Sequence, residues 1–456
     1  MDDRKLSTWQ IASLLASTSC GIGFLLGTGE LALRQGMAAC LYAVATAIGL
    51  LTLAIAAPRL WKTGQSIWGY FDTTYGPAIG RQVAALSLIW MTGVLGAQIR
   101  GASALLELSG VSRTTSIVAV DCLVFGLSFV RLSSLSSLFA ICLGGCNAIL
   151  VYALIREHHL TVWLHAPENF AQSVHLRPIG HVSLTLLSVV ALVICGADYQ
   201  QFLLRARTPS DARSGCLLAA AVVFVIGFLP ASTVIANRGL WQLNVLPDPA
   251  QAVPIELAHT LGHTSGITLL AVAFVLLIAA LGAACSILLA MSDATSTLWP
   301  GACRRAAVER LLPVLAATLV ATSGQSIIDM MVMLNIIYLA AVGPLLGLTL
   351  LNCHITYHAA KRSMLTGFGI AMTCYLVRWT NTVTLHESLT LVLAWPCALL
   401  EVLRHGLQRS EPAHPGSSQP LDSKPVTHLR QHRQFPAEED RGAELAYGAR
   451  DGSQDR

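Results

Sequence analysis

The chain has 456 residues, of which 54% are hydrophobic and only 12% are charged. No soluble domain buries that much apolar surface, so the composition indicates a polytopic membrane protein. The chain contains neither a P-loop nor an HExxH motif, and its basic residues trace a membrane topology rather than a nucleic-acid-binding face. We therefore expect a lipid bilayer as partner, no nucleic acid, no cofactor and no enzymatic activity.

A helix needs about 20 apolar residues to cross a bilayer. The apolar stretches predict spans near 8–28, 36–57, 81–109, 114–131, 134–155, 181–205, 214–237, 265–298, 308–324, 328–352, 363–379 and 386–404. Lys and Arg gather in the segments that face the cytoplasm if the N-terminus is inside. This bias predicts a multi-pass protein of the inner cell membrane with both termini in the cytoplasm.

The spans suggest an organisation in two halves. A transmembrane domain over 1–404 would contain repeat one at about 8–155, repeat two at about 181–352 and two peripheral helices at about 363–404. Residues 405–456 are polar and rich in Pro, Ser, Gln and charge, which is typical of a disordered tail.

Two connections are unusually long. Segment 58–80 is amphipathic and aromatic, as expected of a helix at the inner interface, and 239–263 is a proline-containing outer loop.

The first and sixth spans are interrupted by glycines and polar residues. Lipid offers the backbone no hydrogen-bond partners, so such a break survives only where it lines a cavity in the protein. Interrupted spans at corresponding places in two halves point to the solute site of a secondary transporter. The candidate solute-binding residues are Ser17, Thr18, Ser19, Cys20, Gly21 and Gly23 in span one and Asp198, Tyr199, Gln200 and Gln201 in span six. Close packing by small residues and helix–helix hydrogen bonding are the alternatives.

Asp198 is the most informative ionisable residue, because a carboxylate at the break of a span is a candidate functional group. It could carry a proton, bind sodium, contact a substrate ammonium group, or cap the N-terminus of a half-helix.

Other polar residues have more ordinary expectations. Glu30, near the outer end of span one, is expected to be solvated. Asp121 and Arg100 are candidates for a buried pair. The twelve cysteines form no CxxC pair and are interpreted as packing residues.

Five fragments, in the right order over roughly 8–352, resemble the sodium:solute symporter family, the proline and sugar symporter group. They are Ala57-Pro58-Arg59-Leu60 with Trp68-Gly69-Tyr70-Phe71, Gln98-Ile99-Arg100-Gly101-Ala102, Asp198 to Arg207 followed by Asp211-Ala212-Arg213, Pro247 to Pro254, and Ala341 to Gly347. The resemblance implies the leucine-transporter-type fold, a five-plus-five inverted repeat, alternating access and sodium-driven uptake of a small organic solute.

The chain departs from the family in its eighth core helix, where the resemblance implies adjacent hydroxyl residues that bind sodium. Aligning Leu288-Leu289 with the family places Gly282 and Ala283 there, and their side chains supply no oxygen. Ser286, with carbonyls of span one, is the remaining candidate for a sodium site. The coupling ion, Na⁺ or H⁺, therefore stays open.

The sequence favours a secondary active transporter of a small polar organic solute, such as an amino acid or a carboxylate, by alternating access. The alternative is a sensory or regulatory membrane protein that binds solute on the same fold without transporting it. The substrate and the oligomeric state are not encoded in any pattern we recognise.

Overall fold

The structure is a computed structural model that describes residues 6–130, 132–239, 243, 246, 248–260, 266–299, 306–322, 327–351, 353, 355–379 and 387–405. These residues form helices and no strand, apart from an isolated parallel bridge between Leu6 and Ala206. The prediction of an all-α protein is confirmed. The predicted tail 405–456 lies outside the described residues, except for His405.

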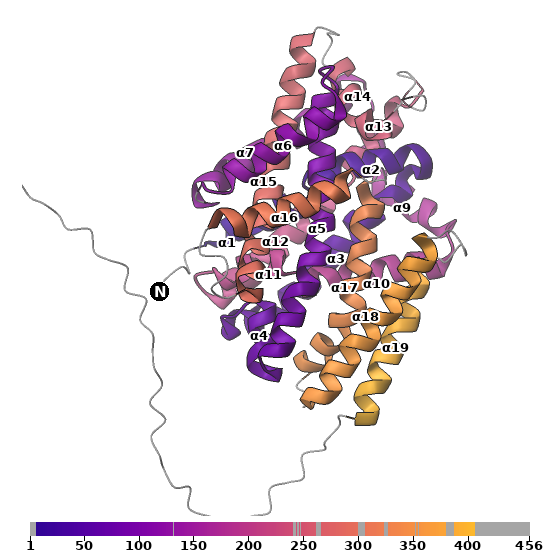
Figure 1. Cartoon of the computed structure of the whole chain (residues 1–456). Helices are drawn as coiled ribbons and strands as arrows, with labels where there is room; N and C mark the ends of the chain where they lie inside the picture. The colour runs from indigo at the N-terminus through magenta and orange to yellow at the C-terminus, as the bar shows by residue number, and fades with distance from the viewer. Residues whose placement is uncertain are drawn as a thin grey trace, which may run out of the picture. The chain divides into compact units, whose positions relative to one another are not determined.

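The first half of the chain begins with a broken helix, as predicted (Figure 1). Its spans are α1 (Thr8–Ser19) with α2 (Ile22–Gln35), then α3 (Leu41–Thr63), α5 (Pro77–Glu107), α6 (Arg113–Leu127) and α7 (Leu132–Arg156). A 3₁₀ turn, η1 (Gly36–Cys40), joins α2 to α3, and α4 (Ile67–Tyr75) joins α3 to α5.

The second half also begins with a broken helix. Its spans are α10 (Ile179–Cys195) with α11 (Ala197–Leu204), α12 (Pro209–Ile226) with α13 (Leu229–Asn237), α15 (Gly266–Leu298), α16 (Ala306–Ala321) and α17 (Ile327–Leu350). Helices α18 (Tyr357–Trp379) and α19 (Glu387–His405) follow and pack against α17 and each other. Each predicted span thus corresponds to one helix or to one interrupted pair.

Three connections differ from the expected boundaries. Helix α3 continues through Pro58 and ends only at Gly64, whose positive φ of 63° suits a residue without a Cβ. Short helices α8 (Leu160–Leu164) and α9 (Ala166–His175) fill the connection before α10. The outer loop contains η3 (Pro249–Gln251) and α14 (Ala252–Thr260). Sequence patterns missed these helices because they are too short to show a clear period.

Length and composition alone identify fewer membrane spans than the sequence analysis predicted. Within the described residues, the helical segments Ile22–Thr63, Pro77–Glu107, Pro209–Asn237 and Ala271–Leu298 are each long and apolar enough to cross a membrane. The pair α10 and α11, bent by 40° at its break, passes the same test jointly. The remaining predicted spans are shorter or less apolar helices packed among these.

Corresponding helices of the two halves pack against each other. Helix α3 packs on α12, its counterpart as second span of the other half, and α5 packs on α15, the counterpart third span. Close packing of helices requires small residues. Helix α12 also packs on α1, and there a Cβ on Gly215 would lie 2.6 Å from Cγ2 of Ile11. Pairing between like elements is what an internal repeat produces.

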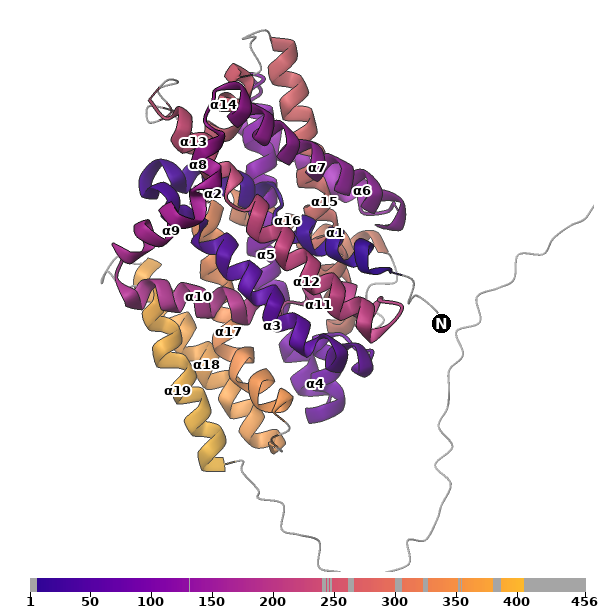
Figure 2. The same cartoon turned by 180° about the vertical axis from the view of Figure 1, so that it is seen from behind.

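Helices α4 and α14 lie at opposite ends of the described helices, and both views agree on this (Figures 1 and 2). At the α4 end, the Leu6 N–H donates to the Arg205 carbonyl at 3.0 Å and the Trp61 indole donates to the Ala206 carbonyl at 2.9 Å. The Tyr75 hydroxyl is hydrogen-bonded to that of Thr349 at 2.7 Å. The segment preceding α1 and the end of α3 are therefore joined to the α11–α12 connection, and α4 is joined to α17.

At the α14 end, the outer loop is fixed to the bundle. Buried Arg100 of α5 forms ion pairs with Glu107, at 3.2 Å, and with Asp248. The Gln251 side chain donates to the Ala104 carbonyl at 3.3 Å. The loop and α14 thus lie directly on α2 and α5.

Candidate functional site

The first break lies at Cys20 and Gly21, between α1 and α2. A Cβ on Gly21 would lie only 2.8 Å from the Ala283 Cβ of α15 and 3.0 Å from the Gln98 Oε1 of α5. The Gly23 N–H, one of the free donors at the start of α2, donates to the same Gln98 oxygen at 3.1 Å. Glycine at position 21 therefore lets α5 and α15 close directly on the break.

The second break lies at Gly196, whose extended backbone separates α10 from α11. The last turn of α10 leaves carbonyls without helical partners, and side chains satisfy them. Gln200 Nε2 donates to the Ile194 carbonyl at 2.7 Å, and the Tyr338 hydroxyl of α17 donates to the Cys195 carbonyl at 2.9 Å. Gln200, predicted as a solute contact, is thus engaged in holding the break.

Asp198 lies in the first turn of α11 and is only 2% exposed. Its Oδ1 has no hydrogen-bond partner among the described residues, and a Cβ on Gly196 would lie 2.6 Å from that oxygen. The carboxyl therefore turns back toward the break. A buried carboxyl beside a helix N-terminus is compatible with each role left open by the sequence.

Tyr199 connects the two breaks. Its hydroxyl interacts with the side chain of Ser19 and with those of Tyr42 and Asp198. Buried Ser19 and Cys20 of span one thus lie near the polar start of α11, and Thr18 is buried beside them in the chain. The structure brings the two predicted halves of the site together, and Ser17 lies at its edge, half-buried.

Helix α15 presents to the site apolar groups and polar groups that already have hydrogen-bond partners. Ala283 faces Gly21, Gly282 is buried beside it, and the Ser286 hydroxyl donates to the Ala283 carbonyl at 2.8 Å. The Ser286 carbonyl receives the Gln201 side chain at 3.4 Å. Among the described residues, no group of three or more His, Cys, Asp or Glu could hold a metal ion.

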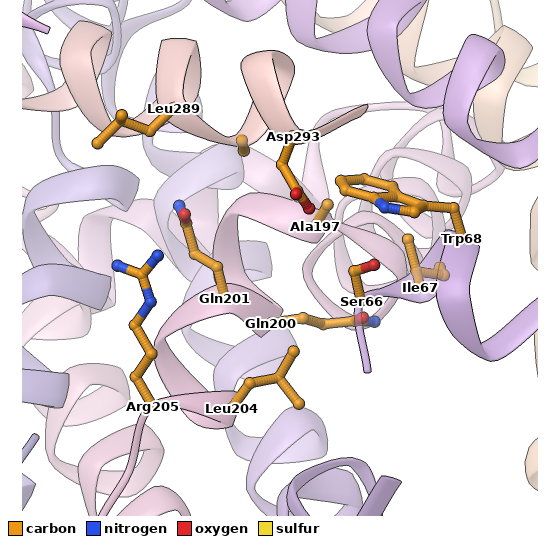
Figure 3. A pocket seen from close by; sticks show the side chains of 11 residues that line it. Ser66, Ile67, Trp68, Ala197, Gln200, Gln201, Leu204, Arg205, Leu289 and Asp293 are labelled. Carbon is orange, nitrogen blue, oxygen red and sulfur yellow. The ribbon is translucent and has the colours of Figure 1, made fainter. Parts of the chain in front are cut away.

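A cavity of about 310 Å³ lies between α4, α11 and α15 (Figure 3). It is lined by Ser66, Ile67, Trp68, Ala197, Gln200, Gln201, Leu204, Arg205, Leu289, Ala290 and Asp293. Gln200 and Gln201 of the predicted set lie on its wall. The span-one residues 17–23 do not, because α5 and α15 pack against their break. The cavity therefore adjoins the second break on the α4 side instead of lying between both breaks.

The cavity presents opposite charges on different helices. Arg205, which follows α11, and Asp293 of α15 both line it and interact electrostatically, but they form no ion pair within 4.0 Å. Figure 3 shows the Arg205 guanidinium beside Gln201 and the Asp293 carboxyl near Trp68. Sequence reasoning missed both because each lies near the end of a span, where an interfacial charge is ordinary.

Two expectations about other ionisable residues are wrong. Arg100 and Asp121 do not pair: Arg100 binds Glu107 and Asp248, whereas Asp121 accepts a hydrogen bond from Thr318 at 2.8 Å. Glu30 is not solvated. It is 6% exposed and lies 3.8 Å from Arg34, because α14 covers this part of α2.

Solved structures similar to this chain are membrane transporters. A Na⁺-coupled sialic acid symporter in a substrate-bound outward-open state matches with a TM-score of 0.68 and 11% identity, over 88% of this chain and 89% of that one. Mhp1 in its inward-facing conformation matches with a TM-score of 0.56 and 14% identity, over 88% and 90%. A manganese transporter of Eremococcus coleocola matches with a TM-score of 0.55 and 11% identity, over 87% and 95%. No protein-family model and no curated protein matches the sequence.

Because the identities are low, these similarities establish the fold and leave the substrate open. The chain is an all-α, multi-pass membrane protein of the leucine-transporter type. The five-plus-five arrangement with two peripheral helices, predicted from hydropathy and the paired breaks, is confirmed.

Proposed function

We propose that this protein is a secondary transporter of a small polar organic solute, such as an amino acid or a carboxylate, that works by alternating access. We further propose that it belongs to the sodium:solute symporter family. The observation that carries the proposal is the meeting of two broken helices, one from each half, at the buried polar groups of Asp198, Tyr199 and Ser19. Broken helices at corresponding positions are the usual site of solute and ion binding in this architecture.

The cavity supports a charged or zwitterionic solute. A carboxylate entering from the α4 side would meet the Arg205 guanidinium, whose planar donors suit two oxygens, while an ammonium group would meet Asp293. A volume of about 310 Å³ accommodates a small molecule. The opposite end is covered by α14 and held by the ion pairs of Arg100. We therefore assign this conformation to the state that is open toward α4.

The same proposal includes the orientation. Lys and Arg are concentrated in the segments on the side of α4, so we propose that this side faces the cytoplasm and that the protein lies in the inner cell membrane. Reporter fusions after residue 175 should then report the outside, and fusions after residue 210 the inside. The opposite pair of results would contradict the orientation.

A second candidate function, a solute sensor, is favoured by the packing of α15. Sodium prefers several oxygen ligands, yet Ala283 contributes a methyl group at the first break and Ser286 bonds within its own helix. A protein that has lost the ion could bind its solute without accumulating it. Accumulation distinguishes the two candidates.

The deciding experiment is uptake by proteoliposomes against a panel of labelled amino acids and carboxylates, with sodium and proton gradients imposed separately. Transport predicts gradient-dependent accumulation of at least one solute. Binding of a solute, seen as a shift in unfolding temperature, without accumulation under either gradient would support the sensor. An R205Q variant should weaken binding of carboxylate solutes, whereas R156Q, at the far end of α7, should leave binding unchanged.

A further inference from the structure

A second buried carboxyl lies far from the breaks, beneath the outer loop. Glu256 of α14 is 0% exposed, and its Oε1 accepts hydrogen bonds from Asn237 Nδ2, at 2.8 Å, and from Thr260 Oγ1, at 3.2 Å. Its other oxygen, Oε2, has no partner among the described residues, and neither has Oδ1 of Asn237. Two unsatisfied acceptors thus belong to side chains that are already joined by one hydrogen bond.

A single proton would supply both atoms with a partner. If Oε2 of Glu256 carries a hydrogen, it can donate to Asn237 Oδ1 while Asn237 Nδ2 donates to Oε1. The carboxylic acid and the amide then form a cyclic pair of two hydrogen bonds. An ionised carboxylate cannot donate, so it leaves the buried amide oxygen without a partner, and an unpaired buried acceptor destabilises the structure.

The surroundings also disfavour the ionised form. Helix α14 packs against α2, α7, α13, α15 and η3. The charged groups on or beside these elements in the described part of the chain are Glu30, Arg34, Arg156, Glu157, Arg238, Asp248, on α14 itself His259, and, toward the other end of α15, Asp293. Of these described groups, Glu157 acts appreciably on Glu256, and it is negative. Burial first, and Glu157 second, raise the pKa of Glu256 to about 7, against the opposing hydrogen bonds of Asn237 and Thr260.

We propose that Glu256 is a proton-binding site whose proton holds α14 in place on α13, and that loss of this proton releases α14. The ligand is the proton itself, taken up from the side of the membrane that α14 faces. Because α14 also covers α2, its release would uncover the half of span one that follows the first break. This inference concerns the outer loop alone, so it does not depend on which solute is carried or on the role of Asp198.

The direction of the pH dependence follows from the raised pKa. In the unfolded chain Glu256 ionises near its ordinary value of about 4.3, whereas in the seated helix it stays protonated to about 7. The stabilising contribution is therefore complete below the lower value and is lost as the pH rises through the upper one. We expect α14 to loosen on the alkaline side.

The test uses the full-length protein and an E256Q variant, because glutamine reproduces the protonated acid: its amide can donate to Asn237 Oδ1 and its oxygen can accept. The matched control is E168Q, which changes an exposed carboxyl on α9. The infrared difference spectrum of the wild type minus E256Q should show a protonated-carboxyl C=O band that disappears as the pH rises through about 7. The difference spectrum of the wild type minus E168Q should lack this band.

Hydrogen exchange across α14 provides the second measurement, with variants compared at equal pH. At about pH 6 the wild type and E256Q should exchange alike; above about pH 8 the wild type should exchange faster, by up to about tenfold per pH unit. Absence of the band at about pH 6, or a constant ratio of the two exchange rates, would overturn the proposal.

If E256Q does not fold, N237D provides the test: two carboxyls would share one proton and move the midpoint of the band to higher pH. An unmoved midpoint would equally count against it.

Discussion

The break between α1 and α2 and the break between α10 and α11 occupy corresponding places in the two halves, yet different groups satisfy their backbones. At the first, Gly21 admits Ala283 into close contact, and one side chain, Gln98, accepts a hydrogen bond from a free N–H. At the second, Gln200 and Tyr338 donate to free carbonyls. The first break is thus held mainly by packing and the second by hydrogen bonds.

This difference indicates a structural role for the first break and a chemical role for the second. The first break contributes small residues and contacts two helices, which suits a pivot between α5 and α15. The second contributes Asp198, one oxygen of which has no partner in the described part of the chain, and this break adjoins the cavity. A solute or ion that needs polar partners would therefore find more of them at the second break.

The largest expected effect on transport comes from Asp198, the chemical group of the second break. D198N keeps the shape of the side chain but cannot exchange a proton, so proton-driven uptake should fall by at least about tenfold, or about 1.4 kcal/mol in the barrier. Solute binding should be largely retained. D72N, at an exposed aspartate of α4, is the control and should transport normally. Uptake that saturates with sodium and does not depend on the pH gradient would show that Asp198 is not the proton carrier. Ser286 would then be the candidate sodium ligand.

These contrasts were only partly accessible from the sequence. Interruptions of hydropathy located both breaks, because an interruption depends on local composition, whereas the contact of Ala283 with the first break appears only in the packed structure. Gln98 and Tyr338 could not be assigned to the breaks, since each reaches across from a helix distant in sequence. A polar residue in an apolar span, such as Gln98, was the available signal, but its partner is defined only by tertiary packing.

The buried carboxylates show the same limit. Glu30 lies toward the outer end of predicted span one and Glu256 in the predicted outer loop, where the sequence suggests contact with water, but α14 packs on α2 and both side chains are buried. The cavity was likewise expected between the two breaks and lies beside one of them. Burial is a property of the packed helices, so hydropathy along the chain does not report it.

A change at Gly21 tests whether packing holds the first break. In G21V the new Cβ would lie 2.8 Å from that of Ala283, and backbone or helix must shift to relieve the contact. We expect the free energy of unfolding to fall by about 3 kcal/mol or more. G144V, at a glycine of α7 with nothing within 4 Å, should change it little. Thermal unfolding in detergent measures both, and equal stabilities of the two variants would show that the break is loosely packed.

A smaller loss is expected when the single hydrogen bond at the first break is removed. Q98M fills nearly the same volume but leaves the Gly23 N–H without an acceptor, and an orphaned buried donor costs about 2 kcal/mol. Q172M, at an exposed glutamine of α9, is the control. If Q98M is as stable as Q172M, water or another group accepts the hydrogen bond of the Gly23 N–H. The Gln98 hydrogen bond would then not be needed to hold the first break.

The smallest effect is expected for Y338F at the second break. The Cys195 carbonyl loses the tyrosine hydroxyl, but a carbonyl with one missing partner is tolerated better than an unpaired N–H, because it has two lone pairs. The neighbouring Ile194 carbonyl keeps its bond from Gln200, so the half-helix stays anchored. We expect a loss of about 1 kcal/mol relative to Y152F, which alters an exposed tyrosine. If Y338F loses more stability than Q98M, the comparison between the breaks is reversed. The second break would then depend more strongly on the Tyr338 hydroxyl than the first depends on the Gln98 amide.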